Sequence, residues 1–413
     1  MSALTVPVSK LDLPGLKPHP FNPANGFDET TVITLAVLNN PDLKAARLQA
    51  GVAEAQLLEA GLLPDPVVNG GLSQSSVRTG YSIGLSEDLQ ALILRDAAKA
   101  AARAHERDVN LQILWQEWQV AEKARELFIQ TEADARLRRI LTANRDLLAE
   151  RYRQDQAAFE RHDATAAAVT ADSAALNDAD AQLRRLETQI NDTSHALNQL
   201  LGLQPETKLR FTGSAEFRAL SRREFQSAVA ALPRRRADLQ ALQAGYQSQE
   251  ETLREAVLAQ FPAMSAGVQQ GKSAEEGVHT IGFTVNVTLP IFNRNRGQIA
   301  IQRATHAVLF QTYQARLDQA VSEADQLWQA AQIMARQLQD LQARLPSEEK
   351  IAAAAKRSFQ RGNLDAATYV GLELNFQAEQ AEAIRLRASL DQAQAALETL
   401  LGLPFESREI NLE

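Results

Sequence analysis

The sequence predicts a mainly α fold with a small β part, in which long antiparallel coiled-coil helices are arranged as an internal tandem duplication. The composition is the first reason: the chain is rich in Ala, Leu, Gln, Arg and Glu and has only 5% aromatic residues, which is typical of long packed helices. The second is that segments of the first half return in the second half in the same order. The third is that four short alternating segments interrupt the helical pattern.

The duplication is visible in matched segments. "LNQLLGLQPE" at Leu197–Glu206 corresponds to "LETLLGLPFE" at Leu397–Glu406, and "FERHDATAAAV" from Phe159 corresponds to "FQRGNLDAATYV" from Phe359. Both pairs lie about 200 residues apart. A slightly smaller offset relates "YSIGLSEDL" to "HTIGFTVNV". Because the order is kept throughout, we expect both halves to share one structural plan.

We expect four parts: an extended proline-rich arm at residues 1–27, a first repeat at 28–206, a second repeat at 207–406 and a tail at 407–413. The first 26 residues contain five prolines and no basic region followed by an apolar one, so they do not read as a secretory signal peptide. Either the protein stays inside the cell, or the sequence begins after a removed signal.

Each repeat is expected to hold an opening helix, two strands, a long helix, a sharp turn and a return helix. The opening helices are predicted at 28–61 and 222–260, and the long helices at 92–158 and 298–361. The return helices should end at the C-capping glycines Gly202 and Gly402. A helix of some 65 residues is roughly 100 Å long, which no globular domain needs.

The second long helix carries a heptad pattern that predicts coiled-coil packing. Its apolar positions are Phe310, Leu317, Ala324, Ala331, Leu338 and Leu345, with Tyr313, Ala320, Leu327, Met334 and Leu341 between them. Pro346 follows this seam and should kink or break the helix. The run Arg234–Arg236 is expected to form a solvated helix face.

Four strands are predicted at 66–72, 81–89, 262–270 and 278–289, and their alternation indicates one apolar face. An ordinary half-buried sheet packed on a helix would give the same pattern. We favour transmembrane strands, because their length is close to the roughly 9 to 11 residues that cross a bilayer and no charge lies between Thr280 and Leu289. The expected lipid-facing residues are Tyr81, Ile83, Leu85, Met264, Val268, Ile281, Phe283, Val285, Val287 and Leu289.

Open sheet edges are not tolerated in lipid, so four strands need neighbouring copies of the chain to close a barrel. Several other classes are disfavoured. The chain has no cysteine, a net charge of −8 with no basic domain, and no apolar run long enough for a membrane-spanning helix. Phosphate-binding, dinucleotide and hydrolase motifs are absent from the sequence, and the six histidines are scattered. We therefore expect no nucleic-acid binding, no enzymatic activity, no cofactor and no metal site.

The duplicated order, "LLPDPVVNGGLS" at Leu62–Ser73 and "TLPIFNRNRGQI" at Thr288–Ile299 resemble the TolC-like outer-membrane efflux proteins. The wording around the second motif is most similar to the heavy-metal, cobalt-zinc-cadmium type branch that serves resistance-nodulation-division pumps. The resemblance implies a homotrimer with a twelve-stranded β-barrel in the outer membrane of a Gram-negative-type envelope. An α-helical barrel would continue from it through the periplasm.

The resemblance also implies partners: outer-membrane lipid, a periplasmic adaptor and an inner-membrane pump of the resistance-nodulation-division type. It makes a removed signal peptide the better explanation of the N-terminus. Two alternatives stay open. One is a soluble helical coiled-coil scaffold, and the other is an outer-membrane duct for type I secretion.

Two sets of site residues follow from the resemblance. The turns between long and return helices should form tips on which the adaptor docks, with Thr165 and Asp365 as N-caps and Gly362 allowing the tight turn. The expected tip residues are Phe159, Arg161, His162, Thr165, Phe359, Arg361, Gly362, Asn363 and Asp365.

The second set is the strand-to-helix junction, which should turn the last strand into the long helix, with contact to lipid headgroups as a secondary role. It consists of Pro290, Asn293, Arg294, Arg296 and Gly297. A ring of carboxylates just inside the tips is not expected, because alanines follow Thr165. Closure of the entrance could depend on Tyr369 or on contacts between helices.

Overall fold

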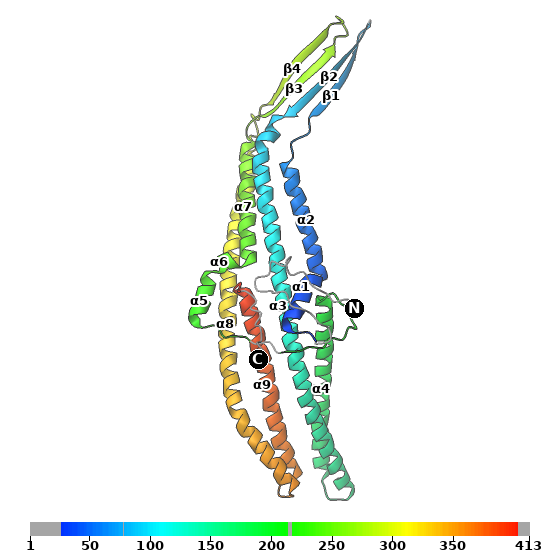
Figure 1. The fold of residues 1–413 in the computed structure, drawn as a ribbon, viewed down its shortest axis with the longest axis vertical. Coiled ribbons are helices and arrows are strands. Elements are labelled where there is room, and N and C mark those ends of the chain that lie inside the picture. Colours follow the sequence, from blue (N-terminus) through cyan, green and yellow to red (C-terminus); the bar gives the residue numbers. More distant parts are fainter. Residues whose placement is uncertain (1–25, 77, 214–216, 404–413) are drawn as a thin grey trace. The chain divides into compact units, whose positions relative to one another are not determined.

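The computed structural model describes residues 26–76, 78–213 and 217–403 (Figure 1). Residues 1–25 of the predicted arm and the whole predicted tail at 407–413 lie outside the described residues. The described chain is mainly helical with one small sheet, as predicted. Its elements in chain order are α1 Glu29–Asn39, α2 Pro41–Gly61, β1 Val67–Gln74, β2 Thr79–Asp88, α3 Leu89–Glu160, α4 Ala166–Leu200, α5 Arg222–Ala230, α6 Leu232–Arg235, α7 Ala237–Leu258, β3 Ala263–Lys272, β4 His279–Thr288, α8 Arg296–Gln360 and α9 Ala366–Leu400.

The chain divides into two compact units. Unit 1 is formed by Met1–Lys44, Gln116–Leu232 and Ala320–Glu413, and unit 2 by Ala45–Trp115 and Pro233–Gln319. The long helices α3 and α8 therefore contribute to both units. Unit 1 holds the helical hairpins α3/α4 and α8/α9 with α1 and α5, whereas unit 2 holds the sheet with α7 and most of α2.

In unit 1, α9 packs against α8, α3 and α4. Leu390 and Ala393 of α9 meet Ala331 and Leu338 of α8 in one buried cluster. A second cluster joins Leu137 and Leu141 of α3, Leu186 of α4 and Ala381 of α9. Ala320 and Ala324 are fully buried, so small side chains line the seam where helices approach closely. The predicted coiled-coil seam is confirmed from Ala320 to Leu341, but Phe310 is 46% exposed.

Both opening helices are interrupted, contrary to the prediction of continuous helices at 28–61 and 222–260. The first breaks at Asn40, because Pro41 lacks an N–H and disfavours helical geometry in the residue before it. The Asn40 side chain then accepts a hydrogen bond from the Leu43 N–H, at 3.0 Å, and starts α2. The second becomes α5, α6 and α7, and Pro233 lies in the four-residue helix α6.

Pro346 does not break its helix, since α8 continues from Arg296 to Gln360. A proline deprives the carbonyl four residues earlier of its helical partner. That carbonyl belongs to Gln342, which is exposed, so water can replace the lost donor. Of the two predicted outcomes, a kink or a break, the break does not occur.

Arg236 is also not solvated, which corrects the expectation for Arg234–Arg236. Its side chain is fully buried, while Arg234 and Arg235 are exposed. The guanidinium donates two hydrogen bonds to the Asp238 carboxylate, at 2.9 and 2.7 Å, and lies 4.7 Å from the centre of the Trp115 ring. Arg316 of α8 also donates to Asp238, at 2.8 Å. The three charged groups tie α7 to α8 within unit 2.

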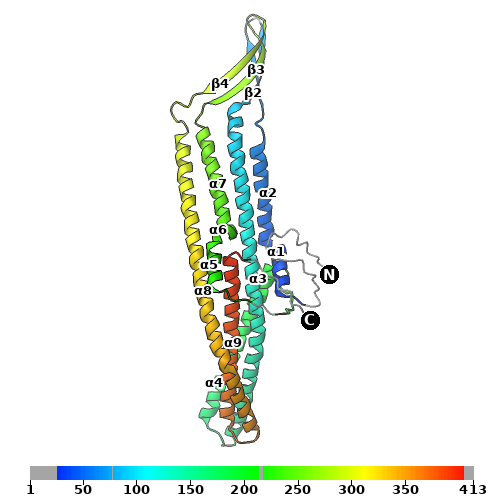
Figure 2. The same cartoon turned by 60° about the vertical axis from the view of Figure 1, so that its left-hand side comes forward.

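The sheet of unit 2 is an antiparallel meander in the order β1-β2-β3-β4. Figures 1 and 2 show it at one end of the helical segments of that unit. Its central pair joins distant parts of the chain, with Tyr81 opposite Lys272 and Asp88 opposite Ser265. The four predicted strands are confirmed with ends shifted by one or two residues. Strands β1 and β4 are the edges of the sheet within the described chain.

We predict that Arg236→Ala lowers the free energy of unfolding by about 3 kcal/mol, because removing one partner of a buried ion pair leaves Asp238 less well compensated. The matched control is Arg235→Ala, which removes an exposed arginine and should change stability by less than about 0.5 kcal/mol. Thermal unfolding followed by circular dichroism measures both. Equal effects of the two variants would contradict the structural role given to Arg236.

Candidate functional site: the apolar sheet face and the hairpin tips

The strand register places the predicted lipid-facing residues on one side of the sheet. Directly paired residues of neighbouring strands share a face. One row of pairs runs Val68, Leu85, Val268 and Phe283, and the next joins Ile83 and Ile281 through Gln270. Met264 opposite Val287 and Ala266 opposite Val285 extend the same side. We call this side the apolar face. Leu289 follows directly after the end of β4.

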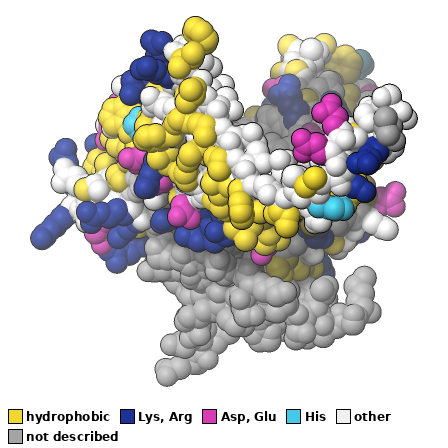
Figure 3. All heavy atoms as spheres, turned by 90° about the horizontal axis from the view of Figure 1, so that it is seen from above, with side chains coloured by type: hydrophobic (Ala, Val, Ile, Leu, Met, Phe, Trp, Pro, Cys, Tyr) yellow, Lys and Arg dark blue, Asp and Glu magenta, His cyan; other side chains and the backbone are white. Residues whose placement is uncertain are grey.

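The apolar face is uncovered within the described chain. Phe283 is 86% exposed and Ile281 78%, values expected for side chains with nothing packed on them. Figure 3 shows hydrophobic side chains gathered in a continuous band when the molecule is seen from above. Two β1 residues, Val68 and Leu72, join this face and are strongly exposed. The sequence analysis missed them because glycines interrupt the alternation of β1.

The opposite face of the sheet carries small and polar side chains. Ser82, Ser86, Thr280 and Thr284 lie there, and the Asn286 side chain donates to the Ser265 hydroxyl at 3.3 Å. We call it the polar face. A Cβ at Gly267 would come within 2.6 Å of the Leu85 carbonyl oxygen, so this face is crowded as well as polar. The sheet therefore has one apolar and one polar face.

The strand-to-helix junction turns the chain through a short non-helical segment after β4, as predicted. Arg294 and Asn295 both have positive φ, 48° and 51°, and reverse the chain before α8 begins at Arg296. Asn295, which the prediction omitted, donates its side-chain N–H to the Ala256 carbonyl of α7 at 2.8 Å. The sequence analysis also did not single out Ile291 and Phe292, which are 63% and 88% exposed. Gly297 adopts no unusual backbone conformation.

The two hairpin tips have the same backbone geometry. In the first, the Asp163 N–H donates to the Ala158 carbonyl, and in the second the Asn363 N–H donates to the Ser358 carbonyl. These bonds close a Schellman motif, in which one residue takes a left-handed conformation. That residue is His162 in the first tip, with φ 64°, and Gly362 in the second, with φ 73°. The tight turn expected at Gly362 is confirmed.

The predicted N-caps are confirmed as well. Thr165 accepts a hydrogen bond from the Ala168 N–H at 3.2 Å, and Asp365 accepts one from the Thr368 N–H at 2.9 Å. The bond from the Thr368 backbone holds the pKa of Asp365 below its usual range. Gly202 and Gly402 likewise follow the ends of α4 and α9 with positive φ, as C-capping glycines do.

The remaining tip residues form a mostly exposed surface at one end of unit 1 (Figures 1 and 2). Arg161 and Asp163 make an exposed ion pair at 3.4 Å. Phe159 is 44% exposed, whereas the Phe359 ring stacks on Tyr369 with 4.9 Å between ring centres. Burial raises the pKa of Tyr369, helped by nearby Glu373. The two tips are therefore similar in backbone and different in side chains.

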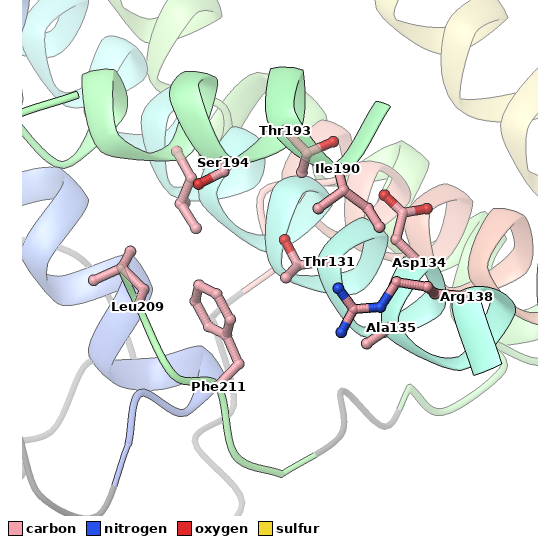
Figure 4. Close-up of a pocket in the computed structure, with 10 residues that line it drawn as sticks. Thr131, Asp134, Ala135, Arg138, Ile190, Thr193, Ser194, Leu209 and Phe211 are labelled. Atoms are coloured by element: carbon pink, nitrogen blue, oxygen red, sulfur yellow. The ribbon is translucent and has the colours of Figure 1, made fainter. Parts of the chain in front are cut away.

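Unit 1 also contains a cavity of about 260 Å³ that the sequence analysis did not anticipate. Figure 4 shows the Arg138 side chain reaching toward it from α3, with Phe211 on the other side. Asp134 beside it is almost fully buried and accepts hydrogen bonds from Gln130 and Gln189, at 2.8 and 2.9 Å. Burial raises the pKa of this carboxyl. Its lining holds a single carboxylate, Asp134, beside the guanidinium of Arg138.

No helix among the described residues is long and apolar enough to cross a bilayer. In the same part of the chain, His, Asp and Glu side chains form no group of three or more that could hold a metal ion.

The comparisons with known proteins concern the second half of the chain and the whole fold. Residues 229–403 match the family model described as "Outer membrane efflux protein". The match covers less than half of the chain. Members of the family are passive channels and not enzymes. A comparison with curated protein sequences gives no match.

Solved structures of outer-membrane channels share the fold of this chain at low sequence identity. One is CusC, whose crystal structures concern the conformational changes that accompany folding and transmembrane channel formation. It is 16% identical with a TM-score of 0.74, and the match covers 94% of this chain and 96% of the CusC chain. The CmeC outer membrane channel of Campylobacter jejuni is 16% identical with a TM-score of 0.77, covering 93% and 88%. The outer membrane protein VceC of Vibrio cholerae is 16% identical with a TM-score of 0.74, covering 92% and 97%.

The tips supply a prediction with an internal control. Gly362→Ala should destabilise the second tip by about 1 kcal/mol, because a side chain in the left-handed region clashes with the following carbonyl. His162→Gly should instead stabilise the first tip or leave it unchanged, since it relieves the same clash. Hydrogen exchange of the amides at 160–165 and 360–365 measures the two effects locally. Faster exchange at the second tip in the first variant is expected, and an unchanged rate would contradict it.

Proposed function

We propose that the chain is the protomer of a trimeric outer-membrane duct in which three four-stranded sheets close a twelve-stranded barrel. One observation carries this proposal: the sheet has an uncovered apolar face, a polar face and two open edges. Open edges inside a bilayer leave backbone groups without partners, and closure with neighbouring copies satisfies them. The family match and the fold likeness support the same assembly.

The dimensions of the apolar face fit a bilayer. From Ile281 to Leu289 the strand advances about 27 Å at about 3.4 Å per residue, close to the apolar band of roughly 25 Å in outer-membrane barrels. Lys272 and His279 lie at the hairpin end of the same face, where a headgroup region would begin. Ile291 and Phe292 with Arg294 are suited to the opposite headgroup region, since apolar and basic side chains combine there.

We further propose that the helical hairpins form the periplasmic part of the duct and that a periplasmic adaptor docks on the tips. The exposed residues Arg161, His162, Arg361 and Asn363 would supply this surface. The equal bounds of α4 and α9 at an offset of 200 residues support the tandem duplication into repeats at 28–206 and 207–406. A duplicated protomer presents two similar tips, so three protomers would offer six docking positions.

The energy for transport would come from an inner-membrane pump, and we propose one of the resistance-nodulation-division type that exports heavy-metal cations. The motif from Thr288 to Ile299 and the fold likeness to CusC support this assignment. A type I secretion duct would have the same barrel and differ only in its pump. A soluble scaffold would need some other segment to cover the apolar face.

The first experiment is the native mass of the chain, exported behind a working signal peptide and extracted with or without detergent. A detergent-dependent particle of about three times the 45.3 kDa chain mass, conducting ions in a planar bilayer, is expected. A monomer or dimer that stays in aqueous solution without detergent would overturn the duct and favour the scaffold. Metal resistance restored to a strain lacking its own duct would separate metal export from polypeptide secretion.

Charge substitution tests the two faces of the sheet separately. Phe283→Arg places a charge on the apolar face and should cost about 2 to 4 kcal/mol near the bilayer midplane, which abolishes most of the trimer. Thr284→Arg, the matched control one residue away, places the charge on the polar face. It should leave assembly intact and change the conductance or ion selectivity. Equal loss of trimer in both variants would contradict the assignment of the faces.

A further inference from the structure

A buried carboxyl lies between the two helices of the first hairpin, close to its tip. Asp172 of α4 is only 3% exposed, and its Oδ1 lies 2.7 Å from a terminal nitrogen of Arg151 on α3. Its Oδ2 is buried and has no hydrogen-bond donor within the described residues. Asp155 of α3 lies within hydrogen-bonding reach of Asp172. Two carboxylates cannot bond to each other unless one of them carries a proton.

The other charged and polar groups near this pair lie on α3, on α4, on α9 and in the tip turn. On α3 the facing groups are Arg151 and Asp155 themselves. From α9, Tyr369 and Val370 pack against the neighbouring cluster of Leu148 and Ala179. Glu373 of α9 lies near Tyr369, and one step along the hairpin Arg145 pairs with Asp180 at 3.2 Å. His162, in the tip turn, is the nearest histidine in sequence.

The second hairpin has no counterpart of this group. At the offset of 200 residues that relates the two hairpins, Arg151, Asp155 and Asp172 correspond to Ile351, Ala355 and Leu372. The same positions therefore hold a charged cluster around the buried Asp172 in one hairpin and apolar side chains in the other. Burying charged groups costs free energy that an apolar core does not, so helix packing alone does not require this cluster.

We propose that Asp155 and Asp172 form a proton-dependent switch that controls how closely α3 and α4 are held near the tip of the first hairpin. With one shared proton, the two carboxyls and Arg151 are together neutral, and every buried oxygen can be satisfied. Without it, the cluster carries one net negative charge and the two carboxylates repel each other. The switch goes beyond the proposed duct and does not depend on it.

The direction of the effect follows from the pKa of Asp172, which burial and the neighbouring Asp155 raise from 3.8 to about 6. Between these two values the folded hairpin holds a proton that an unfolded chain has released. The contribution of this carboxyl to stability is therefore present at low pH and is lost as the pH rises through about 6. Acid should tighten the hairpin, and neutral pH should loosen it.

The test is the distance between α3 and α4, measured by electron paramagnetic resonance on the full chain. Because the chain has no cysteine, Ala157→Cys and Ala171→Cys provide the only two thiols for spin labels. Labelled chain is diluted with unlabelled chain so that each assembly carries one pair. The matched pair in the second hairpin is Arg357→Cys with Gly371→Cys. Both pairs are measured between pH 5 and pH 7.5.

We expect the distance distribution of the first hairpin to broaden and lengthen with a midpoint near pH 6, and that of the second to stay constant. Asp172→Asn mimics the protonated form and should keep the short distance throughout. The triple change of Arg151→Ile, Asp155→Ala and Asp172→Leu, which copies the second hairpin, should also remove the pH response. His162→Gln should retain it.

A pH-independent distance in the otherwise unchanged first hairpin would overturn the proposal. So would a pH response that persists in Asp172→Asn or disappears in His162→Gln. None of these results bears on the barrel, which the native mass and conductance test separately.

Discussion

The rest of this structure depends on two features of its sheet, its unpaired edges and its uncovered apolar face. Four strands leave one row of backbone hydrogen-bonding groups unpaired on β1 and another on β4, and they leave an apolar face with nothing packed on it within the described chain. Either deficit alone could be tolerated at a protein surface, where water pairs with the edges and scattered apolar residues are common. Together they are what the proposed duct explains, because in it copies of the chain would pair edge to edge and lipid would cover the apolar face.

The helical part relies on a different balance. Small side chains such as Ala320 and Ala324 bring α8 close to its neighbours, and the clusters around Leu141 and Leu338 bury aliphatic surface along α9. Charged groups are placed at specific points within this packing. Arg125 of α3, for example, pairs with Glu29 of α1 at 2.6 Å and with Glu398 of α9 at 2.8 Å. Such pairs add little net stability, but in an alternative helix register the same charged groups would be buried without partners.

Local rules made the strands, the long helices and the capping residues predictable. The alternation from Ile281 to Leu289 and the N-cap types at Thr165 and Asp365 act over a few residues, so the sequence alone reveals them. Arg236 shows the opposite case, because its burial depends on Asp238 and on Trp115 far away in the chain. The broken opening helices belong to an intermediate class. Pro41 and Pro233 can be seen in the sequence, but the prediction gave more weight to the helical pattern around them.

The pairing of β2 with β3 has a consequence for how the chain folds. Partners such as Ser82 and Gly271 are separated by nearly half the sequence, while the hairpin α3/α4 closes over neighbouring residues. Contacts between distant residues carry a larger entropic cost of loop closure and form late. The helices of the first half can therefore be complete before the partner strands of β1 and β2 have been synthesised. During that interval the apolar strands are exposed to water, so a cell making this protein has to keep them from aggregating until the second half arrives.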